Sequence, residues 1–384
     1  MKICYVANSR FPSERAHMTQ IVHMCNAFAL CGHKVTLYVT NRETDIIESP
    51  EAFFGVPINF SVVRISVPDI AGVSPKIPPL LRPLFFTVQR LVFAYRASRH
   101  MSSYVLVYGR DEWILWLMSL FSKARIVWES HEARYSFAGK MLIKKGVPIV
   151  AISEGIRDFY IERGVKEEIF VAHDAVDERF FAPHISTESA RKILNISTQK
   201  PIVMYIGGLE KWKGVEILCK ASEGQSIFEV YVVGGKEKEI ALLEQKYPSV
   251  HFLGQRAYRD LPVSQQAADI LVIPNSAKDA ISSKYTSPLK LFTHMTSKKT
   301  LVASRVQSIM NILTTDDVFF FEPDNDVSLQ KTLIEALIQG EESKKKTTHA
   351  YEKVFQYTWE SRAEHIVSFI ARHNLIRQGS RART

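Results

Sequence analysis

Apolar and polar positions along the first half of the chain form blocks of two kinds. Short runs rich in Val, Ile and aromatic residues predict buried parallel strands, and longer stretches with apolar residues every three or four positions predict helices between them. The predicted strands are Ile3–Ala7, Lys34–Val39, Val62–Val67, Val105–Tyr108, Arg125–Trp128 and Ile149–Ile152, with helices over about Met18–Leu30, through Phe85–Arg99 and from Glu112. This order predicts a doubly wound parallel sheet, with functional residues at the carboxyl ends of its strands.

The same pattern starts afresh after the polar segment His184–Lys200. Further strands are predicted at Ile202–Ile206, Glu229–Val233, Val250–Leu253, Ile270–Ile273, Leu301–Ala303 and Val318–Phe321, again with helices between them. We therefore expect an α/β protein of two Rossmann-like domains facing a central cleft, residues 1–183 and 184–358. The amphipathic segment that follows predicts a helix, about residues 359–376, which we expect to return to the first domain.

The composition is that of a globular protein. The 384 residues are 46% hydrophobic and 23% charged, which suits two domains of ordinary size. The four cysteines follow no metal-ligand or redox spacing, so we interpret them as reduced core thiols. The chain enters its first strand directly after Met1 and Lys2, and no apolar run reaches the roughly 20 residues of a membrane span. We expect a cytoplasmic protein.

The positive charge is unevenly distributed. The formal net charge is +9, and the segment from Lys76 to His100 joins basic residues with bulky apolar ones and contains no acid. An anionic membrane surface attracts that combination, although a core-facing helix with a solvated basic edge gives the same pattern. No recognised nucleic-acid motif accompanies the charge, so nucleic acid is not an expected partner.

A polar loop and a helix start follow the apolar run Ile270–Ile273. Ser287 suits the N-cap position and Pro288 the first helical position, so the free N–H groups of the next turn would form an anion site. A diphosphate could bind there. The alternative is one more capped helix of an α/β domain.

A glycine pair follows the first strand of the second domain. Gly207 and Gly208 would let the backbone approach a bulky anion, and Lys213, at the start of the next predicted helix, adds a positive charge. The spacing is neither that of a P-loop nor that of a dinucleotide-binding Gly-x-Gly-x-x-Gly turn. The two glycines could equally form a tight strand-to-helix turn.

These residues belong to a series of short motifs that runs through the whole chain. The series is Gly32-His-Lys-Val35, Trp128-Glu-Ser-His131, Gly207–Gly214, Val232-Val-Gly-Gly235, Phe252-Leu-Gly254, Ala268–Pro274, Ser287-Pro-Leu-Lys-Leu-Phe292 and Trp359-Glu-Ser-Arg362. In this order and spacing the chain resembles the retaining, nucleotide-sugar-dependent glycosyltransferases of the GT-B fold, in particular family four, the glycosyl transferases group 1.

The resemblance implies that the second domain binds the nucleoside diphosphate of a sugar donor. Lys213 and the backbone N–H groups of Leu289 and Lys290 would stabilise the departing diphosphate. In the family no metal or other cofactor is required, and no clustered Asp/Asp ligand motif contradicts this. The donor-binding residues so implied are Gly207, Gly208, Lys213, Gly235, Arg256, Ser287, Pro288, Leu289, Lys290 and Thr293.

The resemblance also implies that the first domain binds the acceptor. His131 matches the family's histidine over the donor sugar, where a neutral ring could hydrogen-bond a sugar hydroxyl or stabilise developing positive charge. His131 and Lys213 are the predicted catalytic residues. Acceptor contacts are expected from the first loop and from the end of the fourth strand: Arg10, Glu14, Arg15, Arg110 and Asp111. The first-loop residues could instead serve only to solvate the loop.

Two positions depart from the family pattern. Most members carry two glutamates, of which the second holds the ribose, and the aligned residues here are Tyr285 and Thr293. A lost charge-assisted contact would weaken donor binding by about one to two decades. The chain could therefore be an active transferase with a modified donor site, or an inactive GT-B scaffold or partner protein. A GT-B epimerase would need acidic and histidine pairs that the sequence does not identify.

The resulting hypothesis is an enzyme of glycan or polysaccharide biosynthesis. It would transfer one sugar from a UDP- or GDP-sugar to a hydroxyl of a glycan or lipid-linked glycan, with retention of configuration. A lipid-linked acceptor at the inner face of the membrane would explain the basic and apolar segment 76–100, through peripheral contact with anionic lipid.

Overall fold

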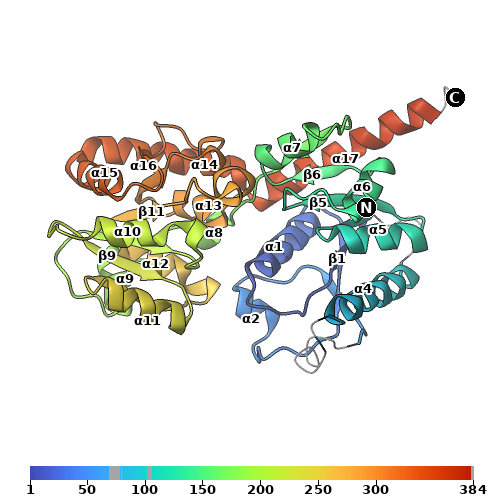
Figure 1. Cartoon of the computed structure of the whole chain (residues 1–384), viewed down its shortest axis with the longest axis horizontal. Coiled ribbons are helices and arrows are strands. Elements are labelled where there is room, and N and C mark those ends of the chain that lie inside the picture. The colour runs from blue at the N-terminus through green and yellow to red at the C-terminus, as the bar shows by residue number, and fades with distance from the viewer. Residues whose placement is uncertain (69–77, 79, 102–105, 382–384) are drawn as a thin grey trace. The chain divides into compact units, whose positions relative to one another are not determined.

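The computed structural model describes residues 1–68, 78, 80–101 and 106–381, which fall into two compact units (Figure 1). The N-terminal unit consists of Met1–Ile152, Ile156–Ala172 and Trp359–Thr384, and the C-terminal unit of Ser153–Gly155 and His173–Thr358. The predicted boundary after residue 183 thus differs from the observed one. Residues 173–183 belong to the C-terminal unit because Phe181 is buried in its core and Val176 pairs with Thr358.

The N-terminal unit alternates strands and helices. Its strands are β1 (Lys2–Ala7), β2 (Lys34–Thr40), β3 (Ser61–Ile65), β4 (Leu106–Gly109), β5 (Arg125–Ser130), β6 (Ile149–Ala151) and β7 (Ile169–Val171). Its helices are α1 (Ala16–Leu30), α2 (Pro50–Phe54), α4 (Arg82–Arg99), α5 (Glu112–Phe121), α6 (Phe137–Lys144), α7 (Glu154–Ile161) and α17 (Trp359–Arg381).

These strands form a parallel sheet in the order β3-β2-β1-β4-β5-β6-β7. The chain runs outward in both directions from β1 and β4, so the topological switch point lies between these two strands, and a crevice for ligands is expected at their carboxyl ends. The last helix, α17, packs against α1 (Figure 1). It therefore belongs to the N-terminal unit, although it follows the C-terminal unit in the sequence.

The C-terminal unit repeats the same architecture. Its strands are β8 (Ile202–Ile206), β9 (Glu229–Val233), β10 (Val250–Phe252), β11 (Ile270–Ile273), β12 (Thr300–Ser304) and β13 (Phe319–Phe321). Its helices are α8 (Glu178–Phe181), α9 (Thr187–Ile193), α10 (Val215–Ala221), α11 (Glu237–Lys246), α12 (Leu261–Ala267), α13 (Leu289–Met295), α14 (Gln307–Met310), α15 (Asp326–Ile338) and α16 (Gly340–Val354).

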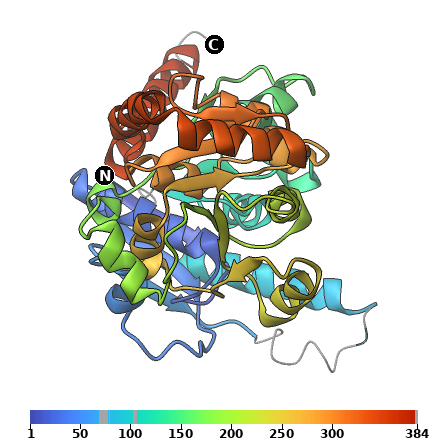
Figure 2. The same ribbon diagram turned by 90° about the vertical axis from the view of Figure 1, so that its left-hand side faces the viewer.

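The second sheet has the order β10-β9-β8-β11-β12-β13, with its switch point between β8 and β11. Side chains of β8 alternate between two apolar clusters: Ile202, Met204 and Ile206 join one, and Val203 and Tyr205 join the other. Helices flank this sheet on both sides (Figures 1 and 2). Side chains of α9, α12, α13, α14 and α16 join the first cluster, and those of α10 and α15 join the second. Burial on both faces explains why these strands read as continuous apolar runs in the sequence.

The structure differs from the sequence-based prediction in a few elements. Strand β7 (Ile169–Val171) was not predicted from the sequence. The polar segment 184–200 contains α9, whose Ser186 side chain accepts a hydrogen bond from the Ser189 N–H as its N-cap. Val105 and residues 382–384, within the predicted fourth strand and the tail, lie outside the described residues. The four cysteines are free thiols, and Cys31 is only partly buried.

Candidate functional site

A pocket of about 370 Å³ opens at the switch point of the N-terminal sheet. Its volume lies within the range of small-molecule sites, roughly 300–1,000 Å³. It is formed by the residues that follow β1, β4 and β5, with contributions from α1, α4 and α5. The lining residues are Val6, Ala7, Asn8, Ser9, His17, Ile21, Arg90, Arg110, Asp111, Glu112, Trp128, Ser130, His131, Glu132 and Arg134.

His131 stands just beyond the end of β5 and lines this pocket. Its Nε2–H donates to the carboxylate of Glu129, two residues earlier on the strand. That tautomer leaves Nδ1 as the acceptor nitrogen of the ring, and within the described part of the chain no hydrogen bond engages it. His131 is therefore arranged to accept a hydrogen bond from a hydroxyl group in the pocket.

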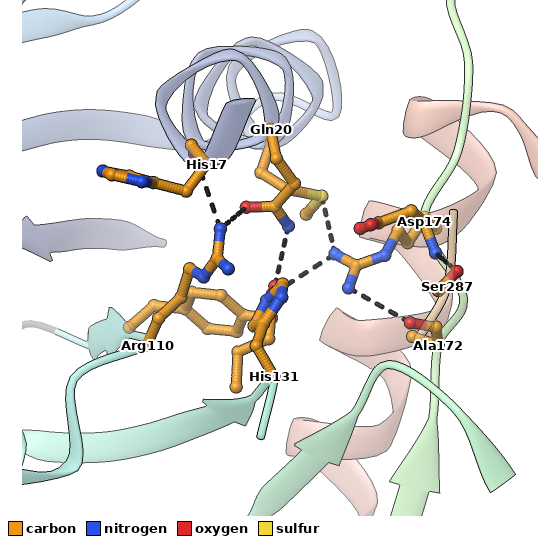
Figure 3. Close-up of polar contacts among 11 residues, drawn as sticks. His17, Gln20, Arg110, His131, Ala172, Asp174 and Ser287 are labelled. Carbon is orange, nitrogen blue, oxygen red and sulfur yellow. Dashed lines mark hydrogen bonds and ion pairs between the residues drawn. The ribbon is translucent and has the colours of Figure 1, made fainter. Parts of the chain in front are cut away.

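Glu129 is fully buried, and besides His131, side chains from three other elements satisfy it. Gln20 Nε2 of α1 donates to Oε1 at 2.7 Å, and the Tyr108 hydroxyl of β4 donates to Oε2 (Figure 3). Arg362 of α17 lies with Nη1 3.3 Å from Oε2 and donates from Nη2 to the carbonyl of Ala172 at 3.2 Å. The last helix of the chain thus neutralises the carboxylate that orients the pocket histidine.

The electrostatics keep the pocket histidines neutral. Burial and the neighbouring Arg110 lower the pKa of His131 to about 3, and the same two causes, with Arg15, lower that of His17 to about 4. Burial raises the pKa of Glu129, but the Arg362 charge and the interactions with His131 outweigh it and hold that pKa well below its usual range. At neutral pH the carboxylate is ionised and both imidazoles are uncharged.

The structure brings only some of the predicted acceptor residues to this pocket. Arg110 and Asp111 line it. Asp111 also caps α5, because its Oδ1 accepts hydrogen bonds from the backbone of Trp113 and Ile114 at 2.9 and 3.2 Å.

Arg10, Glu14 and Arg15 are not among the lining residues. Arg10 forms an ion pair with Glu14 at 2.7 Å, and Arg15 is exposed at the start of α1. These contacts fit the alternative role of solvating the first loop.

In the C-terminal unit, glycines allow a close approach of backbone at the end of β8. Gly234, at φ +119°, would place a Cβ 2.0 Å from the carbonyl oxygen of Gly207, and Gly214, at φ +71°, one 1.8 Å from that of Pro274. Side chains at either position would push the loop 207–214 away. Gly235 has a packing role, since a Cβ there would lie 2.2 Å from Leu209.

Two lysines lie together at this loop. Lys213 forms an ion pair with Glu210 at 2.8 Å, and a Cβ on Gly208 would lie 2.8 Å from its Nζ. Lys213 belongs to a 3-10 turn, Lys211–Lys213, ahead of α10 rather than to the helix itself. Lys290 reaches the same place from α13: its buried Nζ lies 4.4 Å from the ring centre of Tyr205, whose hydroxyl donates to the Gly208 carbonyl at 2.6 Å.

Lys290 is the least satisfied charge of this region. Among the described residues its Nζ has no hydrogen-bond partner. Burial and the charge of Lys213 lower its pKa to about 7. A buried ammonium without an acceptor is costly unless an anion approaches it.

The predicted helix start requires a correction. Pro288 occupies the N-cap position of α13, and no side chain caps the helix. Ser287 is buried and instead accepts a hydrogen bond from the backbone N–H of Asp174 at 2.8 Å. Helix α13 has only seven residues, and Lys290 is its second residue.

The two positions that depart from the family pattern also differ in the structure. Thr293 is buried; its hydroxyl donates to the Lys290 carbonyl and accepts from Gln265 Nε2, both at 3.1 Å. Tyr285 ends a π-helical turn, Ile281–Tyr285. Arg256 is exposed in the loop after β10.

Sequence reasoning missed the roles of Glu129, Arg362 and the Lys290 side chain. A carboxylate within an otherwise apolar strand was the available signal for Glu129, but the sequence does not reveal that Arg362, at the other end of the chain, is its partner. Across the described residues no group of three or more His, Cys, Asp or Glu side chains is arranged to hold a metal ion.

Comparison with known proteins gives a family match for part of the chain and identifies the fold of the whole. Residues 200–339 match the family model described as "Glycosyl transferases group 1". Among solved structures, the chain is similar to sucrose-phosphate synthase from Thermosynechococcus elongatus, with a TM-score of 0.74 and 17% identity over 97% of this chain and 98% of that one. No curated protein matches the sequence.

Two further structures are similar along their whole length. Anabaena HepE, solved in complex with UDP-glucose, gives a TM-score of 0.74 and 16% identity over 97% of this chain and 99% of that one. WaaG, a glycosyltransferase involved in lipopolysaccharide biosynthesis, gives a TM-score of 0.65 and 15% identity over 96% of this chain and 99% of that one. The predicted GT-B fold is confirmed, and the family match confirms the predicted relation to the group 1 glycosyltransferases for residues 200–339.

Proposed function

We propose that this GT-B protein, whose residues 200–339 match the group 1 glycosyltransferases, is an active transferase that moves one sugar from a UDP- or GDP-sugar to a hydroxyl of a glycan or lipid-linked glycan, with retention of configuration. The donor diphosphate binds at the loop 207–214 and Lys290, and the acceptor binds in the N-terminal pocket. HepE has been solved with UDP-glucose, which makes a UDP-sugar the first donor to test.

The observation that carries the proposal is the pair of lysines at a glycine loop. Lys213 is held by Glu210, and Lys290 is buried without an acceptor. When the bond between the sugar C1 and the phosphate oxygen breaks, its electron pair goes to the diphosphate. The ammonium groups of Lys213 and Lys290, fixed beside the diphosphate, stabilise its negative charge as it develops.

The same pair supports catalysis without a metal ion. A divalent cation commonly neutralises a leaving diphosphate, and here two lysine charges would take that role. We therefore expect turnover to persist when a chelator is present, and a loss of turnover restored by Mg²⁺ or Mn²⁺ would contradict this part of the proposal.

His131 contributes a neutral ring to the acceptor pocket. With its Nε2–H committed to Glu129, its Nδ1 can accept a hydrogen bond from a sugar hydroxyl. This arrangement favours positioning through a hydrogen bond over stabilisation by a charged imidazolium.

A donor screen tests the proposal. The full chain is incubated with UDP- and GDP-sugars, and thermal stabilisation and slow donor hydrolysis are measured. Stabilisation by at least one of them is expected, since ligand that binds only the folded state raises its melting temperature. The absence of any binding at millimolar concentration would instead favour the inactive scaffold. The anomeric configuration of the product, read by NMR, tests retention.

Lys213→Ala is the matching variant, and Lys211→Ala is its control on the same turn. Loss of the charge at position 213 should lower turnover by about two to three decades, the scale found for removal of one transition-state donor, with little effect on stability because Lys213 is partly exposed. Equal effects of the two substitutions would show that Lys213 has no special role.

We also propose that α4 contacts an anionic membrane surface. The helix buries one narrow stripe, which includes Gln89, Phe93 and Ala97, while apolar side chains on its other faces are exposed. The exposed set is Leu84, Phe85, Phe86, Val88, Leu91 and Tyr95, and the helix contains four arginines and no acid. Lys76, Ile77 and Pro79 of the predicted segment lie outside the described residues.

Vesicle sedimentation tests the membrane contact. Vesicles with anionic lipid should bind the protein at low salt, and Leu84→Ser with Phe85→Ser should reduce binding, because both apolar insertion and charge contribute. Equal binding to neutral vesicles would contradict a role for the arginines. In the part of the chain that the structure describes, no helix is long and apolar enough to cross a membrane.

A further inference from the structure

One positive charge in the N-terminal pocket has no ionic partner. The Arg110 guanidinium donates to Gln20 Oε1 at 3.2 Å and to the His17 carbonyl at 3.5 Å (Figure 3). Both acceptors are neutral. Within the described residues no carboxylate lies within ion-pair distance of Arg110, although the side chain lines the pocket.

The neighbouring arginines differ in this respect. Arg134 forms an ion pair with Glu112, and Arg90 lies 3.9 Å from Asp111. Arg362 is bound to Glu129. Each of these charges is balanced by a carboxylate of the same unit, and Arg110 is the exception among the arginines around the pocket.

Glu129 does not fill this gap. Its Oε1 accepts from Gln20 and His131, and its Oε2 from Tyr108 and Arg362, so both oxygens are already engaged. Gln20 lies between the two charges, with its Nε2 towards Glu129 and its Oε1 towards Arg110. Arg362 already neutralises Glu129, and the two histidines are uncharged. Glu132, which also lines the pocket, lies 3.7 Å from Arg134, so Arg110 remains the lining arginine without a carboxylate at ion-pair distance among the described residues.

Resting on the function proposed above, we propose that the acceptor glycan carries an oxyanion, a phosphate or a carboxylate, and that Arg110 binds it. A planar guanidinium presents paired N–H donors that match the oxygens of either group. The pocket walls reduce contact with water, so the interaction is stronger than at an open surface. Arg110 therefore selects a charged acceptor over a neutral sugar of the same size.

Binding of small acceptor analogues tests this inference without a donor. Glucose 6-phosphate, glucuronate and glucose are titrated calorimetrically into the full chain, its Arg110→Gln and Arg110→Lys variants, and Arg125→Gln as a charge-matched control. Arg125 is exposed at the start of β5, at the opposite end of that strand from the pocket. Urea unfolding of each variant checks that the fold is retained.

We expect one or both charged sugars to bind more tightly than glucose. Arg110→Gln should weaken that binding by about tenfold to a hundredfold, the scale of a charge-assisted hydrogen bond. Arg110→Lys should restore part of it, and Arg125→Gln should leave it unchanged. If glucose 6-phosphate alone binds, the site is a phosphate site. If both charged sugars bind, it is a general oxyanion site.

Two results would overturn the inference. One is equal affinity of the wild-type chain for glucose and for both charged analogues; the other is equal loss of binding in Arg110→Gln and Arg125→Gln. Donor-dependent thermal stabilisation, measured on the same variants, belongs to the C-terminal unit and should not change in Arg110→Gln. A protein that binds the charged sugar but no nucleotide sugar would disprove the proposed transferase activity while leaving the oxyanion site in place.

Discussion

Buried polar groups near the switch points of the two sheets differ in whether they have hydrogen-bond partners. In the N-terminal unit, donors from α1, β4 and α17, together with His131 just beyond β5, surround the buried Glu129. In the C-terminal unit, the Lys290 Nζ, the Asn275 side-chain amide and the His294 Nε2 are buried, and none of them finds a partner among the described residues. Both regions lie at the carboxyl ends of parallel strands.

The difference separates a completed polar network from buried polar groups that have no partner among the described residues. A fully satisfied network fixes the geometry of its members, because any change leaves a buried charge unpaired. An unsatisfied buried group lowers stability and is retained where a ligand completes its hydrogen bonds. The contacts of Glu129 and Arg362 hold the fold together, whereas the buried Lys290 Nζ has no hydrogen-bond partner among the described residues, which is the observation behind its proposed role in binding.

The largest effect is expected from Arg362→Met. The substitution keeps most of the side-chain volume but leaves the Glu129 carboxylate without its main counter-charge, so the free energy of unfolding should fall by about 3–5 kcal/mol. Urea denaturation measures the loss. The double variant Arg362→Met with Glu129→Gln should recover part of it, and if it were as unstable as the sum of the single variants, the two residues would not be coupled.

Lys290→Met should act in the opposite sense on stability. Removal of an unpaired buried ammonium should leave the free energy of unfolding unchanged or raise it, whereas UDP binding should weaken by about tenfold or more through the lost charge-assisted contact. Calorimetry with UDP and urea denaturation are the two measurements, with Lys211→Met as the control. A large loss of stability with unchanged UDP affinity would assign Lys290 to the architecture.

Acid should destabilise the N-terminal network through His131. The folded pKa is about 3 and the unfolded pKa about 6.5, so the unfolded chain binds more protons between these values. His131 makes its full contribution to the free energy of unfolding above about pH 6.5. That contribution falls as the pH decreases towards 3, by at most about 1.4 kcal/mol per pH unit.

Urea denaturation across this pH range tests the effect with two variants. His131→Asn should show a shallower acid-side decline than the wild type, because the titrating group is gone. His184→Asn, at an exposed position, is the control. Parallel curves for the wild type and His131→Asn would contradict the assignment of a neutral buried histidine.

The smallest effect is expected from Thr293→Glu. Thr293 follows Lys290 by one helical turn, and a carboxylate there would restore the ribose ligand that the family resemblance implies. UDP affinity should rise by up to about tenfold, measured by calorimetry, at some cost in stability because the site is buried. Unchanged affinity with the Gln265 hydrogen bond lost would show that Thr293 is structural.

Much of this architecture could be predicted from local sequence. The strands β8, β9 and β11 have the predicted boundaries, because burial on both faces produces uninterrupted apolar runs with clear ends. The motifs at Trp128–His131 and Gly207–Gly214 lie at the carboxyl ends of β5 and β8, as predicted for functional residues of a doubly wound sheet. The Ser287 cap was predicted incorrectly, since its hydroxyl is used by a backbone N–H far away in the sequence.

The sequence by itself determined the two-sheet fold, the succession of strands and helices along the chain, and the places of His131 and Lys213 after β5 and β8, since hydrophobic period and turn residues are local properties. Only the tertiary structure decided which charges are paired. Arg362 lies on the last helix and Glu129 on a central strand, and their contact depends on the packing of α17 against α1. The same packing decides that Arg110 has no carboxylate partner among the described residues, because pairing of charges is set by distance in space and not by separation along the chain.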